Sequence, residues 1–246
     1  MHAMGVIPAR YGSTRLAGKP LALINGKPMV QHVYENARRA STLSSVVVAS
    51  DDERVLEAVA AFGGEAVMTS AGHTSGTDRV AEVVRLRDVD IAVNVQGDEP
   101  LMNAEIINEC VRALTDNPGV ELSTVMKRIP ESAYGDPSVV KVVCDAQGRA
   151  LYFSRSLIPY PRHRTAEFAV FEHIGIYAYT KACLARLSRT PPSVLERIEG
   201  LEQLRALENG IAIQVVETAF TGELVSVDTQ EDLERVRAIL TKGMNA

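Results

Sequence analysis

The sequence predicts an α/β protein built on a doubly wound, mainly parallel sheet, and three observations support this fold class. Short runs of β-branched residues alternate with segments of helical periodicity through the first half of the chain, which is typical of βαβ units. After about residue 138 the expected strands follow one another closely, which indicates a small inserted antiparallel subdomain. The 246 residues, 46% of them hydrophobic, suit a single domain of residues 1–246 with a subdomain around 139–190.

The expected elements follow in chain order. Strands are expected at 6–9, 46–50, 65–69, 91–96 and 122–126, and within the subdomain at 139–144, 150–154 and 174–179. Helices are expected from Pro28 onward and at 52–62, 78–86, 104–114, 195–209 and 229–241. Thr229 and Asp232 form a variant of the capping box at the start of the last helix.

Composition excludes several classes of protein. The formal net charge of -5 leaves no basic field of the kind that neutralises nucleic-acid phosphates, so we expect no nucleic-acid partner. The three cysteines are widely spaced and odd in number, which favours neither a disulfide framework nor a zinc site. The chain has no apolar run of 18 residues and no signal peptide at its start, so we expect a cytoplasmic protein without a membrane contact.

The densest motif is a strand that runs into a loop rich in glycine and cations. It reads Val6-Ile-Pro-Ala-Arg-Tyr-Gly-Ser-Thr-Arg-Leu-Ala-Gly-Lys-Pro-Leu21. Because a loop at the carboxyl end of a parallel strand offers backbone N–H groups to phosphates, the motif predicts a triphosphate site around Arg10 and Lys19. It is not a Walker loop, because Pro20 stands where the metal-binding Ser or Thr belongs. The alternative is a basic surface turn.

Carboxylates for a metal must therefore lie elsewhere. Asp98 follows the strand expected at 91–96 and lies at the same carboxyl edge as the loop, and Asp228 stands at the head of the last helix. Such oxygens suit magnesium held across phosphates. A plain turn at Asp98 and a helix cap at Asp228 remain the alternatives. Asp88 and Asp90 imitate an Asp-x-Asp metal motif but precede their strand, so we interpret them as a solvated turn.

Further polar groups lie in the second half of the chain. Arg155 ends the run Leu151-Tyr-Phe-Ser-Arg, and His173 and Tyr177 would share one face of a strand that includes residues 173–179, where they could bind a polyol. A buried histidine and tyrosine with a structural role are the alternative. Glu202 and Gln203 flank the apolar stripe of the helix at 195–209. In the first half, Ser75-Gly-Thr-Asp-Arg79 begins a helix, where Ser75 or Thr77 caps it or the helix N-terminus binds a nucleotide.

Seven motifs in order resemble the 3-deoxy-manno-octulosonate (KDO) cytidylyltransferase family over nearly the whole chain. They are the loop motif 6–21, His73-x-Ser-Gly-Thr-Asp-Arg79, Asn94-Val-Gln-Gly-Asp-Glu-Pro100, Leu151-Tyr-Phe-Ser-Arg155, His173-x-Gly-Ile-Tyr177, Leu201-Glu-Gln-Leu-Arg205 and Val227-Asp-Thr-x-Glu-Asp232. The resemblance implies a nucleotide-diphospho-sugar transferase-like fold, a homodimer, and transfer of CMP from CTP to an octulosonate sugar acid for lipopolysaccharide or capsule synthesis.

The resemblance also assigns roles to residues. It implies nucleotide binding by Ala9, Arg10, Ser13, Lys19, Ser75, Gly76, Arg79 and Asp98, magnesium binding by Asp98 and Asp228, sugar binding by Gln96, Arg155, His173, Tyr177, Glu202 and Gln203, and catalysis by Arg10, Lys19, Asp98 and Asp228. Alternatives are a cytidylyltransferase for amino-KDO, a nucleotidyltransferase for another acidic sugar, a sugar 1-phosphate or a polyol phosphate, and a non-catalytic nucleotide- or sugar-binding module.

Overall fold

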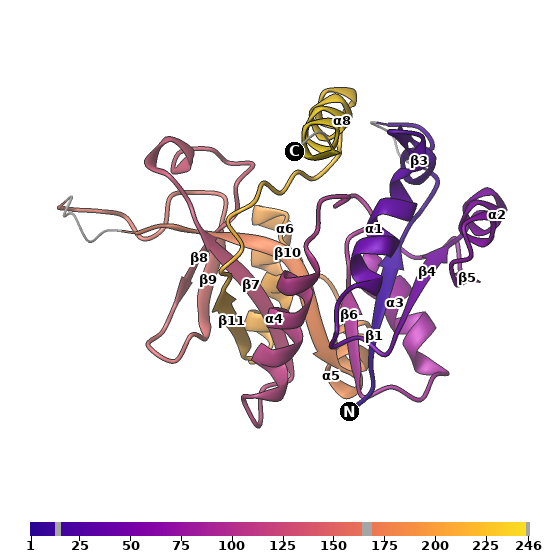
Figure 1. The fold of residues 1–246 in the computed structure, drawn as a ribbon. Helices are drawn as coiled ribbons and strands as arrows, with labels where there is room; N and C mark the ends of the chain where they lie inside the picture. The colour runs from indigo at the N-terminus through magenta and orange to yellow at the C-terminus, as the bar shows by residue number, and fades with distance from the viewer. Residues whose placement is uncertain (13–15, 164–168, 245–246) are drawn as a thin grey trace. The chain divides into compact units, whose positions relative to one another are not determined.

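The computed structural model describes residues 1–12, 16–163 and 169–244 (Figure 1). The chain forms two compact units. The first unit is Met1–Asn108 with Phe220–Ala246, and the second is Glu109–Ala219. The antiparallel subdomain expected around 139–190 lies inside the second unit. Among the described residues, no helix combines the length and apolarity needed to cross a membrane.

The first unit carries a parallel sheet in the strand order β6-β1-β4-β5. Its strands are β1 (Ala3–Pro8), β4 (Ser45–Ser50), β5 (Ala66–Met68) and β6 (Ile91–Asn94), and a separate hairpin pairs β2 (Leu23–Ile24) with β3 (Lys27–Pro28). In register, Val6 lies opposite Val47 of β4 and Asn94 of β6. The helices are α1 (Met29–Arg38), α2 (Glu53–Ala61), α3 (Gly76–Arg85) and α8 (Gln230–Met244), with a 3-10 turn η1 (Lys19–Leu21), and α4 (Ala104–Thr115) contains the boundary between the units.

The sheet of the first unit is apolar because its strands are covered by helices. Val6, Ile7, Val47 and Val93 are fully buried, as expected for parallel strands. The returning C-terminal segment completes this core, since Val227 packs in one cluster with residues of β2 and α1. These observations confirm the predicted α/β class with a mainly parallel sheet.

The second unit is mostly antiparallel. β7 (Leu122–Arg128) pairs antiparallel with β10 (Phe171–Thr180), and β8 (Lys141–Cys144) pairs antiparallel with β9 (Ala150–Ser154) and β10. β11 (Ile213–Glu217), which the sequence patterns did not reveal, runs parallel to β7. The helical segments are η2 (Glu131–Ala133), α5 (Lys181–Leu187), α6 (Val194–Glu199) and α7 (Gln203–Glu208).

The last two helical regions differ in how well the sequence predicted them. The single helix predicted at 195–209 is wrong: Gly200 adopts a left-handed conformation with φ of 64° and ends α6, and α7 starts at Gln203. Ile198 of the predicted apolar stripe is consequently 75% exposed. The capping prediction for the last helix is confirmed, because the Asp232 carboxylate accepts from Thr229 N–H and the Thr229 hydroxyl accepts from Asp232 N–H.

Candidate active site

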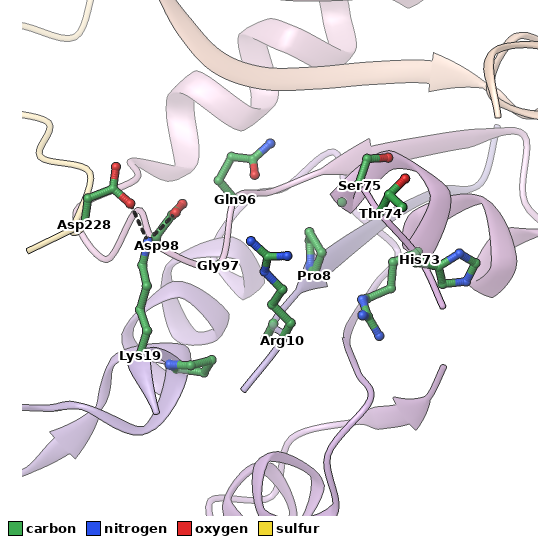
Figure 2. A pocket seen from close by; sticks show the side chains of 14 residues that line it. Pro8, Arg10, Lys19, His73, Thr74, Ser75, Gln96, Gly97, Asp98 and Asp228 are labelled. Atoms are coloured by element: carbon green, nitrogen blue, oxygen red, sulfur yellow. Dashed lines mark hydrogen bonds and ion pairs between the residues drawn. The ribbon is translucent and has the colours of Figure 1, made fainter. Parts of the chain in front are cut away.

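A polar pocket of about 250 Å³ opens in the first unit (Figure 2). It lies beyond the carboxyl ends of β1 and β6. These are the two neighbouring strands between which the strand order reverses. Open α/β sheets bind ligands at such a switch point. Its lining consists of Pro8, Ala9, Arg10, Lys19, Pro20, His73, Thr74, Ser75, Gly76, Arg79, Gln96, Gly97, Asp98 and Asp228.

The loop after β1 supplies the cations. Arg10 is exposed at the pocket, and Lys19 begins the 3-10 turn η1 directly after Gly18, which has a φ of 64°. The Tyr11 ring packs over Gly18, and the Arg54 guanidinium lies 3.5 Å from the centre of the same ring. Two ends of the loop are thus held to each other and to the start of α2. Ser13, predicted to bind nucleotide, lies outside the described residues.

The turn after β6 brings Asp98 to the pocket. Gly97 is required here, because a Cβ atom at this position would lie 2.5 Å from the Pro8 carbonyl oxygen. The Val227 N–H donates to the Asp98 carbonyl oxygen at 2.9 Å. This main-chain bond places Asp228 beside Asp98, although the two residues belong to distant parts of the sequence.

Lys19 joins the two carboxylates (Figure 2). Its Nζ lies 2.7 Å from Asp98 Oδ2 and 2.9 Å from Asp228 Oδ1. Two carboxylates within reach of one cation form an oxygen donor set that suits magnesium, whose remaining positions are usually filled by water and phosphate oxygens. The residues present therefore fit the predicted metal.

The start of α3 forms the opposite wall of the pocket. Ser75 caps the helix, since its Oγ accepts from Asp78 N–H at 3.1 Å. A Cβ atom at Gly76 would lie 3.2 Å from Pro8 Cγ, so the helix N-terminus closely approaches β1. The N–H groups and dipole at this end favour an anion. The capping role of Ser75 and a binding role for the same helix end are therefore compatible.

Arg79 lines the pocket, but its guanidinium is engaged elsewhere. The side chain is 3% exposed, with Nη2 at 2.9 Å from Asp51 Oδ2 and Nη1 bonded to the Thr69 hydroxyl. These bonds join α3 to the ends of β4 and β5. In this arrangement Arg79 anchors the pocket wall.

His73 and Thr74 also line the pocket, although the sequence predicted a role for neither; His73 begins the motif that runs to Arg79. His73 Nε2 bonds the Glu82 carboxylate, which also accepts from Ser70 N–H at 3.0 Å. These contacts lower the pKa of Glu82, chiefly through the bond from Ser70 N–H. His73 and Thr74 come just before Ser75, the cap of α3, and this position in the sequence could have indicated that they lie at the pocket. Asp88 and Asp90 are exposed and do not line this pocket.

His173 and Tyr177 contact each other in the second unit, with ring centres 5.3 Å apart. The Thr124 hydroxyl donates to the Ile176 carbonyl oxygen at 2.6 Å, so its oxygen accepts from His173 Nε2, 3.0 Å away. Burial lowers the pKa of His173 to about 3, and burial raises the pKa of Tyr177 well above its usual range. Both side chains are therefore neutral hydrogen-bonding groups near pH 7.

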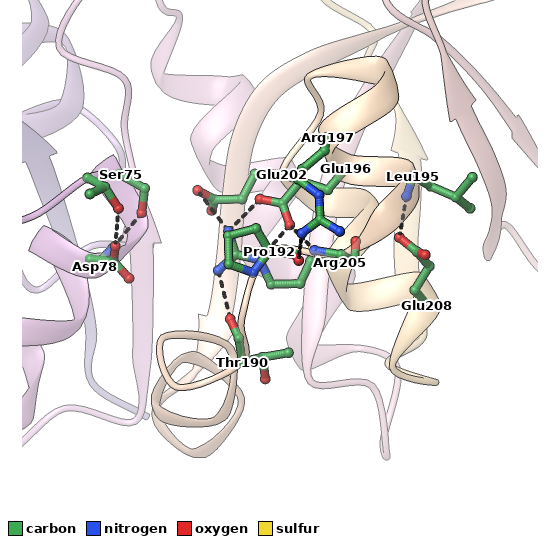
Figure 3. Close-up of polar contacts among 12 residues, drawn as sticks. Ser75, Asp78, Thr190, Pro192, Leu195, Glu196, Arg197, Glu202, Arg205 and Glu208 are labelled. Atoms are coloured by element: carbon green, nitrogen blue, oxygen red, sulfur yellow. Dashed lines mark hydrogen bonds and ion pairs between the residues drawn. The ribbon is translucent and has the colours of Figure 1, made fainter.

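Glu202 and Gln203 lie with Tyr177 around a small pocket of about 20 Å³ in the second unit, enough for one water molecule. The Gln203 Nε2 donor is buried and has no hydrogen-bond partner among the described residues. The neighbouring Arg205 is held by Glu196 through Nε at 2.9 Å and Nη2 at 2.5 Å (Figure 3). Gln203 is thus a buried donor that a polar ligand or water would satisfy.

Arg155 is also positioned by its neighbours in the second unit. Its Nε donates to the Glu199 carbonyl oxygen at 2.8 Å and its Nη1 to the Pro137 carbonyl oxygen at 3.0 Å. The fully buried Lys141 donates to the Arg155 carbonyl oxygen at 2.9 Å. The guanidinium is exposed and fixed in direction, which suits a recognition residue.

Known proteins resemble this chain over nearly its full length. Residues 4–215 match the family described as cytidylyltransferase. A 3-deoxy-manno-octulosonate cytidylyltransferase of Solibacter usitatus (strain Ellin6076) is 50% identical, covering 98% of this chain and 97% of the relative. A solved structure of CMP:2-keto-3-deoxy-manno-octonic acid synthetase complexed with CTP is 46% identical with a TM-score of 0.94, covering 99% of this chain and 100% of that chain.

A more distant structure shares the fold alone. The 4-diphosphocytidyl-2C-methyl-D-erythritol synthase from Anaerococcus prevotii DSM 20548 is 13% identical with a TM-score of 0.63, covering 98% of this chain and 96% of that chain. This likeness extends to the α/β framework.

Proposed function

Because this chain belongs to the 3-deoxy-manno-octulosonate cytidylyltransferase family, we propose that it transfers CMP from CTP to KDO, forming CMP-KDO and pyrophosphate. The product is an activated sugar for lipopolysaccharide or capsule synthesis. The observation that carries the proposal is the pocket in which Lys19, Asp98 and Asp228 face the N-terminus of α3. It combines cations, carboxylates and helix N–H groups, as a nucleoside triphosphate requires.

The reaction is an in-line displacement. The anomeric hydroxyl oxygen of the sugar forms a bond to the α-phosphorus of CTP, the bond from that phosphorus to the pyrophosphate oxygen breaks, and the hydroxyl proton passes to solvent. Arg10 and the N–H groups at the start of α3 stabilise charge on the phosphates. Positioning and charge neutralisation account for most of the catalysis, without a covalent enzyme intermediate.

Magnesium is the proposed cofactor, held by Asp98 and Asp228. When bound, it would neutralise the phosphates and favour departure of pyrophosphate. Asp98→Asn should lower turnover by orders of magnitude while the circular dichroism spectrum is unchanged. Asp88→Asn is the matched control, because Asp88 is an exposed aspartate outside the pocket. Near-normal pyrophosphate release from the Asp98 variant would contradict the metal assignment.

Sugar recognition is proposed for Gln96 and for five side chains of the second unit. These five are Arg155, His173, Tyr177, Glu202 and Gln203. Support comes from the exposed, fixed guanidinium of Arg155 and from the Gln203 Nε2 donor, which has no partner in the described part of the chain; the two groups suit a carboxylate and a hydroxyl group. Measuring KM for the sugar in Arg155→Met and Gln203→Leu tests this proposal, and unchanged KM values would refute it.

The substrate experiment follows pyrophosphate release with each of the four nucleoside triphosphates and with KDO, 8-amino-KDO or a sialic acid, in the presence of Mg²⁺. We expect CTP with KDO to give the highest kcat/KM. A higher value with the amino sugar or sialic acid would reassign the acceptor. A non-catalytic binding module would be stabilised by CTP against thermal unfolding and release no pyrophosphate.

We also propose a homodimer and a cytoplasmic location. Three apolar side chains of the second unit, Leu151, Val194 and Ile198, are more than half exposed, and contact with a second subunit would bury apolar side chains of this kind. Light scattering of the purified protein tests the dimer.

The cysteines Cys110, Cys144 and Cys183 are free, and burial raises the pKa of each thiol, to about 12, 11 and 11 respectively, which suits a reducing compartment.

A further inference from the structure

Lys19 makes contacts that its predicted role does not explain. The resemblance places its ammonium on the phosphates of CTP, yet the structure pairs that ammonium with both carboxylates of the proposed metal site. Its side chain is only 13% exposed, so the two contacts are made in a largely desolvated position. The Asp98 and Asp228 carboxylates are both negative and would repel each other, and the Lys19 ammonium between them reduces this repulsion.

The position of Nζ is also the position that a divalent cation would need. Nζ lies 2.7 Å from Asp98 Oδ2 and 2.9 Å from Asp228 Oδ1, so the two oxygens are separated by no more than the sum of these distances. Magnesium takes oxygen ligands at about 2.1 Å, which places neighbouring ligand oxygens ~3 Å apart. A metal ion between these oxygens would therefore replace the ammonium, because both cations need the same lone pairs.

The lysine backbone is fixed while its side chain is long enough to turn. Lys19 N–H donates to the Leu16 carbonyl oxygen at 3.2 Å, and Leu21 N–H donates to the Gly18 carbonyl oxygen at 2.8 Å, which closes the 3-10 turn. The four-carbon stem of lysine is flexible and its ammonium carries three rotatable donors. Arg10 and the start of α3 line the same pocket as Lys19. Phosphates bound by them would therefore be close enough to attract the lysine ammonium.

We propose that Lys19 acts as a built-in counter-ion that holds the place of the divalent cation until a triphosphate draws its ammonium away. The inference rests on the proposed function and deepens it, because it makes the entry of the metal depend on the nucleotide. Without nucleotide, the carboxylates are open to a metal only in the fraction of molecules whose lysine has moved. If that fraction is about 1–10%, the apparent Kd for the metal is raised ten- to a hundredfold.

The test measures Mn²⁺ binding to nucleotide-free protein by electron paramagnetic resonance of the free ion. Lys19→Met should bind Mn²⁺ at least about tenfold more tightly than the wild type. Lys27→Met is the matched control, because Lys27 also pairs with a carboxylate, that of Glu35 at 2.8 Å, and lies outside the pocket. Arg10→Met measures the effect of removing a pocket cation that does not touch the carboxylates, and its gain should be smaller.

The folding of each variant is checked by circular dichroism, and Lys19→Gln replaces Lys19→Met if the latter does not fold. The double variant Lys19→Met with Asp98→Asn should lose the gain, since one of the two carboxylates is then neutral. Equal or weaker Mn²⁺ binding by the folded Lys19 variants than by the Lys27 control would overturn the proposal.

A second measurement follows the lysine itself. In ¹⁵N-lysine-labelled wild type kept in EDTA, CTP alone should shift the ammonium signal of Lys19, which the Lys19→Met spectrum identifies. An unshifted signal at saturating CTP would overturn the proposal that the triphosphate draws the Lys19 ammonium away from the carboxylates. Neither measurement uses the sugar or turnover, so a failure here leaves the proposed reaction standing, and a failure to form CMP-KDO does not affect these results.

Discussion

Gly97 lies where the turn after β6 passes closest to the end of β1, and Gly97→Ala is expected to impair the active site. An added Cβ atom would lie 2.5 Å from the Pro8 carbonyl oxygen and 3.5 Å from its carbonyl carbon. Ordinary C···O contacts are about 3.3 Å or longer, so the two segments must separate by roughly 0.8 Å. Both crowded atoms are bound to backbone, so no rotamer change can relieve the contact.

The displaced segment is expected to be the turn. β1 is held on both sides, by β4 and by β6, whereas the turn carries Gln96 and Asp98 directly into the pocket. A misplacement approaching 1 Å at a catalytic group costs about a hundredfold in rate. Overpacking of this kind lowers the free energy of unfolding by about 1–3 kcal/mol. We therefore expect kcat/KM for CTP to fall about a hundredfold in a protein that still folds.

The assay is pyrophosphate release with CTP, KDO and Mg²⁺, together with urea unfolding. Gly135→Ala serves as control, because an added Cβ atom there meets nothing within 4 Å and Gly135 is exposed outside both the pocket and the regular elements. Equal kcat/KM values for the two variants would refute the argument that the Gly97 backbone positions Asp98.

Two further predictions concern the second unit. His173 has a folded-state pKa of about 3 against 6.5 in the unfolded chain, so the unfolded state binds more protons between these values and stability is lost as pH falls below about 6.5. Urea unfolding at pH 7, 5.5 and 4.5 should show a loss approaching 1.4 kcal/mol per pH unit that is absent from His173→Gln, and parallel pH dependences would contradict the pKa. Glu196→Gln should lower the free energy of unfolding by about 3 kcal/mol, because it removes the nearer counter-charge of the buried Arg205 guanidinium and leaves Glu202, 4.0 Å away, as a carboxylate partner. Glu234→Gln, which breaks an ion pair that Arg237 makes nearer the surface, should cost less than about 1 kcal/mol, and equal losses would show that burial is not the deciding factor.

The strand and loop patterns predicted the site better than its contacts. Arg10 and Asp98 could be placed at one edge because both follow parallel strands, and the carboxyl ends of such strands meet. The ion pairs of Lys19 could not be predicted, since 209 residues separate it from Asp228 and only the folded chain brings them together. The resemblance implies nucleotide binding by Arg79, whereas its bond to Asp51 depends on a tertiary contact that no local pattern encodes.

The errors in the fold have local causes. The leucine spacing across 195–209 satisfies helical periodicity on both sides of Gly200, so periodicity alone could not reveal the break. β11 was missed because the strand has only five residues and its apolar and polar residues alternate weakly in the sequence. Its pairing with β7 stabilises it in the folded chain. Short elements that depend on a partner strand carry little signal of their own.

The main-chain bond from Val227 to Asp98 has a consequence for the synthesis of the protein. A growing chain that has already formed β1 and β6 carries Lys19 and one carboxylate, but it must still wait for the whole second unit to be translated before Asp228 arrives. Val225 and Val227 reach the core of the first unit in the same step. Closure of that core and completion of the carboxylate pair are therefore one event, and a ribosomal product that stops short of it has neither.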